Sequence, residues 1–298
     1  MSDTSSTPQT PPWEHNASTI DGIISRLLSD QAKEHILALK EGQSEDGFDP
    51  FGFEPHFLRY VAPLFEWLYR SYFATEVSGL EHIPDQGSVL LISNHSGQIP
   101  IDGILIGTSA LLDRSPPRMV RSMVERWVPE IPFFSWIFAR AGQVVGTREN
   151  ARRLLKQGAC VLVFPEGVRG ISKTYDQAYQ LQEFGLGFMR LALETNTPIV
   201  PVAVIGGEEQ MPTVLNLKKL GKIIGAPAFP VTLTWPLIGP LGALPLPVKY
   251  RLQFGEPMHF EGSEDDEDRI IRQHVEQVQQ RIEDMLQQGL EQREGIFI

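Results

Sequence analysis

The chain has 298 residues, of which 42% are hydrophobic and 21% are charged, and its formal net charge is -11. These values are typical of a globular protein with one large or two small domains, and the negative charge argues against a dedicated nucleic-acid binder. The one cysteine, Cys160, excludes an intramolecular disulfide. Because it falls in an apolar run, we expect a small buried side chain rather than a reactive thiol.

The N-terminal part divides into a tail and a helical region. Residues 1–18 are polar, rich in Ser, Thr and Pro, lack the pattern of a secretory signal, and are predicted to be a disordered tail. Residues 19–74 are predicted to be helical, with one amphipathic helix over 19–39 and a second over 55–73. The second helix is dense in aromatic side chains, which is typical of a membrane interface. Packing against the core explains that density equally well.

Apolar runs of four to seven residues alternate with helical patterns from Ser88 onward. Runs that are apolar on both faces, separated by helices, indicate a mostly parallel central sheet flanked by helices. We therefore predict a single α/β domain over residues 75–262, with residues 263–298 forming a helix that packs on it. The expected strands are 88–93, 118–123, 142–145, 159–164, 199–205 and 248–254; the expected helices are 102–112, 149–157, 177–195 and 266–288.

The segment 223–248 contains no charged residue. Its six prolines exclude a membrane-spanning helix. It is long for an irregular loop, and such loops are often functional. It could line an apolar groove for a ligand or dip into a bilayer surface, or it could simply cover an edge of the sheet.

The basic residues are concentrated in one block. Between residues 114 and 156 the sequence has nine basic side chains against three acidic ones. A block of this kind suits a ligand that carries phosphate groups. A solvated basic face, offset by acidic helices elsewhere, explains the same charges equally well.

Polar residues follow two of the predicted strands directly. His95 comes after the strand 88–93, with the carboxylate of Asp102 seven positions later, and Glu166 and Arg169 come after the strand 159–164. A neutral imidazole at a strand end is suited to removing a proton from a hydroxyl. We expect both groups to lie at the same edge of the sheet and to form one site.

These residues resemble four motifs of the glycerolipid acyltransferase superfamily. Asn94-His95-Ser96-Gly97, followed by Asp102, is similar to the first motif, and residues 142–148, ending in Arg148, stand where the second is expected. Phe164-Pro165-Glu166-Gly167-Val168-Arg169 resembles the third motif, and Val200-Pro201-Val202 resembles the fourth. The order Asn-His-Ser-Gly-x-x-Pro-x-Asp resembles a subgroup related to monoacylglycerol and diacylglycerol acyltransferases.

The spacing of the first motif departs from most of the superfamily. Six residues separate His95 from Asp102, where four are usual, and Pro100 occupies the usual acidic position. On an unbroken helix the two side chains would stand about 10 Å apart along the axis, too far for a hydrogen bond. Gly97 and Pro100 favour a loop that could return the carboxylate to the imidazole. The alternative for Asp102 is an acid that only stabilises a helix N-terminus.

The resemblance implies transfer of a fatty acyl group from acyl-CoA or acyl carrier protein to a hydroxyl of a glycerolipid or related membrane lipid, without a cofactor. No metal is expected, because the sequence has no His and Cys cluster with ligand spacing. The resemblance also implies that His95 is the general base, that Asp102 orients it, and that Arg148, Glu166, Gly167 and Arg169 bind substrate. A structural salt bridge between Glu166 and Arg169 is the alternative for that pair. The expected location is peripheral, on the cytoplasmic face of a membrane.

Backbone amides near Gly167 or in the Ser96-Gly97 turn are candidates to stabilise the oxyanion. Two other functions stay open from the sequence. One is a lipid-binding protein of the same fold that has lost turnover through the altered spacing, and the other is a lipid esterase. A hydrolase using Ser96 as nucleophile is disfavoured because the sequence has no Gly-x-Ser-x-Gly elbow.

Overall fold

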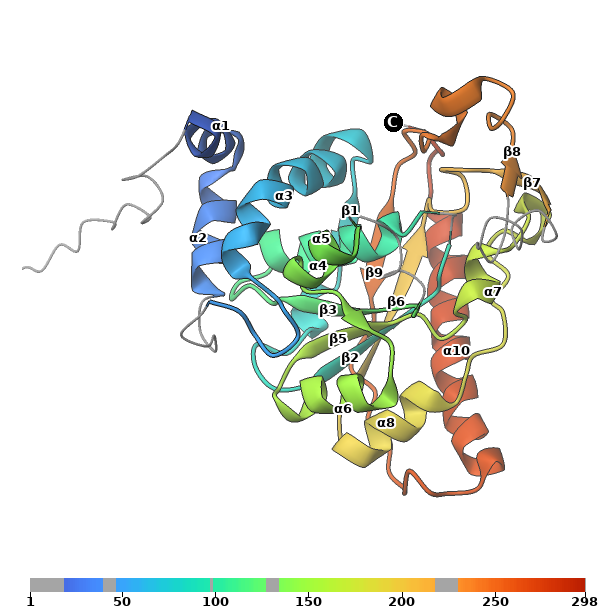
Figure 1. Ribbon diagram of the computed structural model, residues 1–298. Helices are drawn as coiled ribbons and strands as arrows, with labels where there is room; N and C mark the ends of the chain where they lie inside the picture. Colours follow the sequence, from blue (N-terminus) through green and yellow to red (C-terminus); the bar gives the residue numbers. More distant parts are fainter. Residues whose placement is uncertain (1–18, 40–46, 97–98, 127–133, 218–229, 298) are drawn as a thin grey trace, which may run out of the picture.

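The computed structural model describes residues 19–39, 47–96, 99–126, 134–217 and 230–297 (Figure 1). The predicted tail at residues 1–18 and the N-terminal part of the proline-rich segment lie outside the described residues. The boundaries predicted for the domain, 75 and 262, stay predictions.

A seven-stranded sheet forms the centre of the molecule, with the strand order β1-β9-β6-β2-β5-β3-β4. All neighbouring strands are parallel except β6 and β9, which are antiparallel. The mostly parallel α/β fold expected from the sequence is therefore confirmed. The strands are β1 (Glu76–Ser78), β2 (Val89–Ser93), β3 (Val120–Val124), β4 (Val144–Val145), β5 (Cys160–Val163), β6 (Ile199–Ile205) and β9 (Arg251–Phe254).

Helices cover both faces of this sheet, which is why its central strands are apolar throughout. All five residues of β2 are buried. Because side chains alternate along a strand, Leu90 and Ile92 pack into one core cluster, and Val89 and Leu91 pack into the other. Figure 1 shows α6 and α8 below the sheet and α3 and α4 above it. The helices that follow the N-terminal region are α4 (Ile101–Leu112), α5 (Phe134–Arg140), α6 (Arg148–Lys156), α7 (Val168–Ile171), α8 (Gly187–Thr195) and α10 (Asp268–Glu291).

The N-terminal region differs from the single helix predicted over 19–39. It forms two helices, α1 (Thr19–Leu27) and α2 (Asp30–Ala38). The first helix ends at Leu27, and Ser29 caps the second, since its hydroxyl accepts a hydrogen bond of 3.2 Å from the backbone N–H of Ala32. The buried residues of α2, Ala32 and Ile36, pack with residues at the C-terminal end of α4, so α2 is part of the globular unit.

The predicted aromatic helix also differs in form. It is α3 (Pro55–Trp67), which continues into one π-helical turn over Leu68–Tyr72. Phe57, Tyr69 and Phe73 are buried, whereas Leu64 and Trp67 are exposed. Core packing therefore explains part of the aromatic density, and contact with a membrane stays a prediction for the exposed part.

Two further predicted elements are shorter than the sequence suggested. The helix expected over 177–195 is wrong for its first half, because only α8 at Gly187–Thr195 is α-helical after a 3-10 turn at Tyr175–Gln177. The intervening backbone is held by tertiary contacts, including a 2.8 Å hydrogen bond from the Gln182 N–H to the Glu166 carboxylate. The last strand of the sheet begins at Arg251, not at residue 248.

A small second sheet and a loop stand outside this core. β7 (Thr213–Asn216) and β8 (Pro230–Thr232) pair in antiparallel fashion, and a 3-10 helix, η5 (Gly239–Ala243), follows them. The described part of the proline-rich segment thus contains β8, η5 and the irregular stretches around them. Among the helices of the described residues, none combines the length and apolarity needed to cross a bilayer.

Candidate active site

Three neighbouring parallel strands, β5, β2 and β6, bring the polar residues to one edge of the sheet. His95 stands two residues after the end of β2, Glu166 three residues after β5, and Glu208 three residues after β6. Since the carboxyl ends of parallel strands meet at one edge, these groups converge although they are far apart in the chain. The predicted meeting of the His95 motif and the Glu166 motif is confirmed.

The imidazole of His95 contacts the carboxylate of Asp102 directly. The distance from His95 Nδ1 to Asp102 Oδ2 is 2.7 Å. The imidazole is 14% exposed, and the Asp102 side chain is completely buried. With Nδ1 donating its proton to the carboxylate, the acceptor lone pair of a neutral ring is at Nε2, which is the arrangement that a general base requires.

The position of Asp102 in the fold explains how six intervening residues still permit this contact. Asp102 is in the first turn of α4, where its Oδ1 accepts the N–H of Gly103 at 2.8 Å and its Oδ2 accepts the N–H of Ser96 at 3.1 Å. The carboxylate is therefore both a helix N-terminal acid and the partner of His95, so the two interpretations of this residue are compatible. Residues 97–98 of the connecting loop lie outside the described residues.

The surroundings of His95 act on its pKa in opposite directions. Burial lowers the pKa of the imidazole, but the charge and the hydrogen bond of Asp102 raise it, and the net result is a pKa above the ordinary value. Glu166 also raises this pKa, and Lys173 lowers it. The imidazolium that forms when His95 accepts a proton is thus stabilised in place.

Two neighbours fix the ring and its backbone. Phe164, the residue that follows β5, stacks on the imidazole with ring centroids 4.1 Å apart. A Cβ placed on Gly170 would stand only 2.9 Å from the His95 carbonyl oxygen and 3.1 Å from the Glu166 Cβ. Only a glycine lets α7 approach the histidine this closely.

The buried side chain of Glu166 links two chain segments through hydrogen bonds. Its Oε1 accepts the backbone N–H of His95 at 2.9 Å, and its Oε2 accepts the N–H of Gln182 at 2.8 Å. The ammonium group of Lys173 lies 3.9 Å from Glu166 and 2.7 Å from Glu208. Burial raises the pKa of Glu208, and the adjacent Lys173 partly offsets this effect. The substrate-binding role predicted for Glu166 is not tested by these contacts.

Lys173 and Glu208 were not singled out from the sequence. The signal available for Glu208 was its place just after a buried strand parallel to β2, immediately beyond Gly206-Gly207. Lys173 had no comparable signal, because a lysine seven residues after Glu166 is ordinary on a surface. Its burial is decided by the tertiary structure.

Neither predicted arginine contacts His95. Arg148, at the start of α6, pairs with Glu194 of α8 at 2.8 Å. It follows β4, which is three strands from β2, or roughly 14 Å across the sheet. Arg169 donates to the carbonyl oxygen of Glu183 at 2.8 Å, and its ion-pair partner is also Glu183, at 3.7 Å. The Glu166–Arg169 salt bridge considered from the sequence is therefore wrong, and the roles of both arginines in binding substrate stay predictions.

Two of the backbone amides predicted as oxyanion donors, those of Ser96 and Gly167, are engaged elsewhere, and the amide of Gly97 lies outside the described residues. The N–H of Ser96 donates to Asp102, and the N–H of Gly167 donates to the Phe164 carbonyl at 3.1 Å. Gly167 itself has φ of 56°, a conformation that favours glycine, and it forms the sharp turn between β5 and α7. Its predicted place at the site is thus explained by backbone geometry, while a direct contact with substrate stays a prediction.

The basic block between residues 114 and 156 is not one surface. Arg114, Arg118 and Arg121 are buried, and their guanidinium groups donate to backbone carbonyl oxygens. Arg140 pairs with Glu54 at 3.1 Å. Of the two interpretations left open by the sequence, a phosphate-binding patch is therefore wrong for Arg114, Arg118 and Arg121, whose charges serve the packing of loops.

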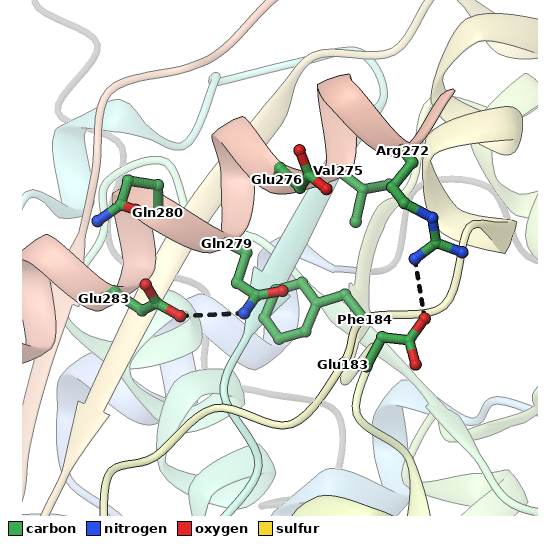
Figure 2. Close-up of a pocket in the computed structure, with 8 residues that line it drawn as sticks. All are labelled: Glu183, Phe184, Arg272, Val275, Glu276, Gln279, Gln280 and Glu283. Atoms are coloured by element: carbon green, nitrogen blue, oxygen red, sulfur yellow. Dashed lines mark hydrogen bonds and ion pairs between the residues drawn. The ribbon is translucent and has the colours of Figure 1, made fainter. Parts of the chain in front are cut away.

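A groove of about 540 Å³ lies between α10 and the segment that precedes α8 (Figure 2). Figure 2 shows Arg272 paired with Glu183 and Gln279 hydrogen-bonded to Glu283 along its walls. His95 and Asp102 do not line it, and its carboxylates do not suit a donor that carries phosphates. In the described part of the chain, no group of three or more His, Cys, Asp or Glu side chains could hold a metal ion.

The chain is similar to acyltransferases over the part that contains His95, Asp102 and Glu166. The family model described as Acyltransferase matches residues 74–205. An uncharacterised protein of Mycobacterium tuberculosis is 37% identical over 254 residues, which cover 84% of this chain and 71% of the relative. A DGAT1/2-independent enzyme synthesizing storage lipids from Bos taurus is 30% identical over 130 residues, covering 43% of this chain and 37% of that enzyme.

Among solved structures, the 1-acyl-sn-glycerophosphate acyltransferase PlsC from Thermotoga maritima aligns with a TM-score of 0.48 and 20% identity. The alignment covers 89% of this chain and 88% of that one. Taken with the α/β fold and the His95–Asp102 pair, the family match defines an acyltransferase. The chain belongs to the glycerolipid acyltransferase family that its four motifs indicated.

Proposed function

We propose that this protein transfers a fatty acyl group from a thioester, acyl-CoA or acyl carrier protein, to a hydroxyl of a glycerolipid, with His95 as the general base. The observation that supports this most directly is the 2.7 Å contact between His95 Nδ1 and the fully buried Asp102 carboxylate. It supports the proposal despite the unusual spacing, because the longer loop does not separate the two side chains.

In the proposed reaction, Nε2 of His95 takes the proton of the acceptor hydroxyl while its oxygen attacks the thioester carbonyl carbon. The negative charge of Asp102 stabilises the imidazolium that results. The tetrahedral intermediate then collapses, the carbon–sulfur bond breaks, and the departing thiolate takes the proton from His95. An ester and a free thiol are the products, and no acyl-enzyme forms.

Glu166 has a positioning role in this proposal. It fixes the backbone N–H of His95, and the stack on Phe164 limits rotation of the ring. The side chains of Arg148 and Arg169 are each more than half exposed. Arg148 pairs with Glu194, and Arg169 pairs with Glu183. A phosphate on the acceptor or the donor could replace these partners through charge-assisted, bidentate hydrogen bonds.

The acceptor and the place of the reaction follow from the same proposal. A glycerolipid acceptor resides in a membrane, so the protein acts peripherally, on the cytoplasmic face. Within the glycerolipids, the subgroup motif and the similarity to an enzyme of storage-lipid synthesis favour a monoacylglycerol or diacylglycerol as acceptor.

The test is a transfer assay with purified protein and labelled acyl-CoA against lysophosphatidate, lysophospholipids, monoacylglycerol and diacylglycerol, read by thin-layer chromatography. His95→Ala should lose on the order of 10²–10⁴-fold in rate, the usual contribution of a general base. His259→Ala, which removes an exposed histidine, is the matched control and should retain activity. Release of free fatty acid without an acceptor would indicate an esterase. No transfer by the wild type with any donor or acceptor would indicate a protein that only binds lipid.

A further inference from the structure

The described residues expose large apolar side chains very unevenly. Within the part of the chain that the structure describes, α6, α8 and α10 contribute none of the exposed large hydrophobic residues. Five of them stand within twelve positions of one another on the loop that contains η5. We call residues 233–244 the leucine loop; its exposed residues are Leu233, Leu237, Ile238, Leu241 and Leu244.

We propose that the leucine loop docks onto the surface of a lipid bilayer and inserts its side chains among the lipids. Leu237 is 80% exposed and Leu241 is 70% exposed, so these side chains project from the protein and do not line a groove. The described residues 230–248 contain no charged side chain, so insertion requires no charge to leave water. The choice of a lipid surface rests on the proposed function, in which the acceptor is a membrane lipid.

The backbone of the leucine loop is already hydrogen-bonded internally, which is the second requirement for entering a bilayer surface. The hydroxyl of Thr232 accepts the N–H of Trp235 at 2.8 Å, and the hydroxyl of Thr234 donates to the Gly242 carbonyl at 2.8 Å. The N–H groups of Ile238 and Leu244 donate to carbonyl oxygens within the same loop. The loop is therefore a folded projection in which these polar groups are paired and the leucines are exposed.

The surface continues onto the exposed side of α3. The Tyr72 hydroxyl donates to the Pro245 carbonyl at 2.7 Å, and the Tyr72 ring packs on Trp67 with centroids 5.2 Å apart. Leu64 and Trp67 of α3, and Ile23 and Leu27 of α1, are exposed. Figure 1 shows α1, α3 and the orange 3-10 helix along its upper side, opposite α6 and α8. Three elements from distant parts of the sequence, each of which carries exposed apolar residues, thus lie along one side of the molecule.

This distribution favours a bilayer over a protein partner. A protein interface carries complementary shape and a polar rim around its apolar centre. The leucine loop instead offers exposed aliphatic side chains, and aromatic residues, which are typical of a membrane interface, adjoin it through the hydrogen bond from Tyr72 to Pro245 and the contact between Tyr72 and Trp67.

The experiment uses the full chain and sedimentation with vesicles of phosphatidylcholine and phosphatidylglycerol. Leu237→Asp combined with Leu241→Asp should lower the bound fraction at least tenfold. Gln273→Asp combined with Gln277→Asp, on the exposed side of α10, adds the same charge and should bind like the wild type. Circular dichroism checks that all variants are folded. Equal binding by the leucine variant would overturn the proposal.

Two further measurements separate this inference from the proposed function. Vesicle binding requires no turnover, so this assay tests docking of the leucine loop independently of acyl transfer. With an acceptor dispersed in detergent, the leucine variant should transfer acyl groups at the wild-type rate. A lower rate in detergent would show that the loop takes part in the reaction itself and would overturn the docking role. Light scattering of the free wild type should show a monomer, whereas a dimer abolished by the leucine substitutions would assign the surface to a second copy.

Discussion

The carboxylate of Glu166 accepts a 2.9 Å hydrogen bond from the backbone N–H of His95, a residue 71 positions earlier in the chain. This bond joins the turn after β5 to the turn after β2. The same carboxylate accepts the N–H of Gln182, so three chain segments meet at one buried side chain. The histidine is thus held from two sides, by Asp102 at its ring and by Glu166 at its backbone.

The pH dependence of transfer should follow the pKa of His95. Burial is the largest single influence and lowers this pKa, but the charge and hydrogen bond of Asp102, together with Glu166, raise it above the ordinary 6.5, so the imidazole is neutral and able to accept a proton only above that raised pKa. The rate should therefore fall as the pH drops through that raised value. In Asp102→Asn the burial remains and the charge is lost, so the acidic limb of kcat/KM should move to lower pH.

The same variant should lose about 10²–10⁴-fold in rate near neutral pH, because the imidazolium is no longer stabilised. The measurement is kcat/KM between pH 5 and about 9 for both proteins. If the acidic limb of the pH profile stays at the same pH in Asp102→Asn, then Asp102 does not raise the pKa of His95.

Glu166→Gln should destabilise the fold. Both oxygens of Glu166 accept backbone N–H groups, and an amide offers only one acceptor, so one buried N–H loses its partner and Lys173 loses a charge nearby. We expect a loss of about 1–3 kcal/mol in the free energy of unfolding, measured with urea. Glu183→Gln makes the same change at an exposed ion pair and should cost less than about 1 kcal/mol. Equal effects of the two substitutions would contradict the stabilising role of the two hydrogen bonds that Glu166 accepts.

Gly170→Ala should impair transfer by crowding the histidine. Its Cβ would stand 2.9 Å from the His95 carbonyl oxygen, so α7 or the turn after β2 must shift. Displacements of this kind cost on the order of tenfold to a hundredfold in rate. Gly107→Ala is a matched control in α4, since nothing lies within 4 Å of its added methyl group. That control should leave the rate unchanged and stabilise the helix by roughly 0.5–1 kcal/mol.

Cys160 should be inert in the folded protein. Burial raises the pKa of its thiol to about 12, although the charges of Arg118 and Arg114 oppose this. The thiolate that reacts with iodoacetamide is therefore scarce and shielded. Mass spectrometry should find Cys160 unmodified in the native protein and modified in urea. Modification of the native protein with loss of transfer would implicate the thiol in the reaction.

The sequence by itself determined the α/β class and the residues that meet at the edge of the sheet. Buried parallel strands must be apolar on both faces, so β2, β5 and β6 were recognisable as continuous runs, and the residues that follow them had to lie together. The four motifs placed the chain among acyltransferases because they depend on residue order, which the sequence states directly.

The tertiary structure alone decided which partner each charged side chain has. In the folded protein Arg169 pairs with Glu183, and Lys173 is buried between Glu166 and Glu208. Residues 178–186 are not helical, and the N–H of Gln182 donates to Glu166 instead of to a helical carbonyl. The tertiary structure also decided that the leucine loop faces outward. Such pairings depend on distances between segments far apart in the chain, and the local pattern of polar and apolar residues carries no record of those distances.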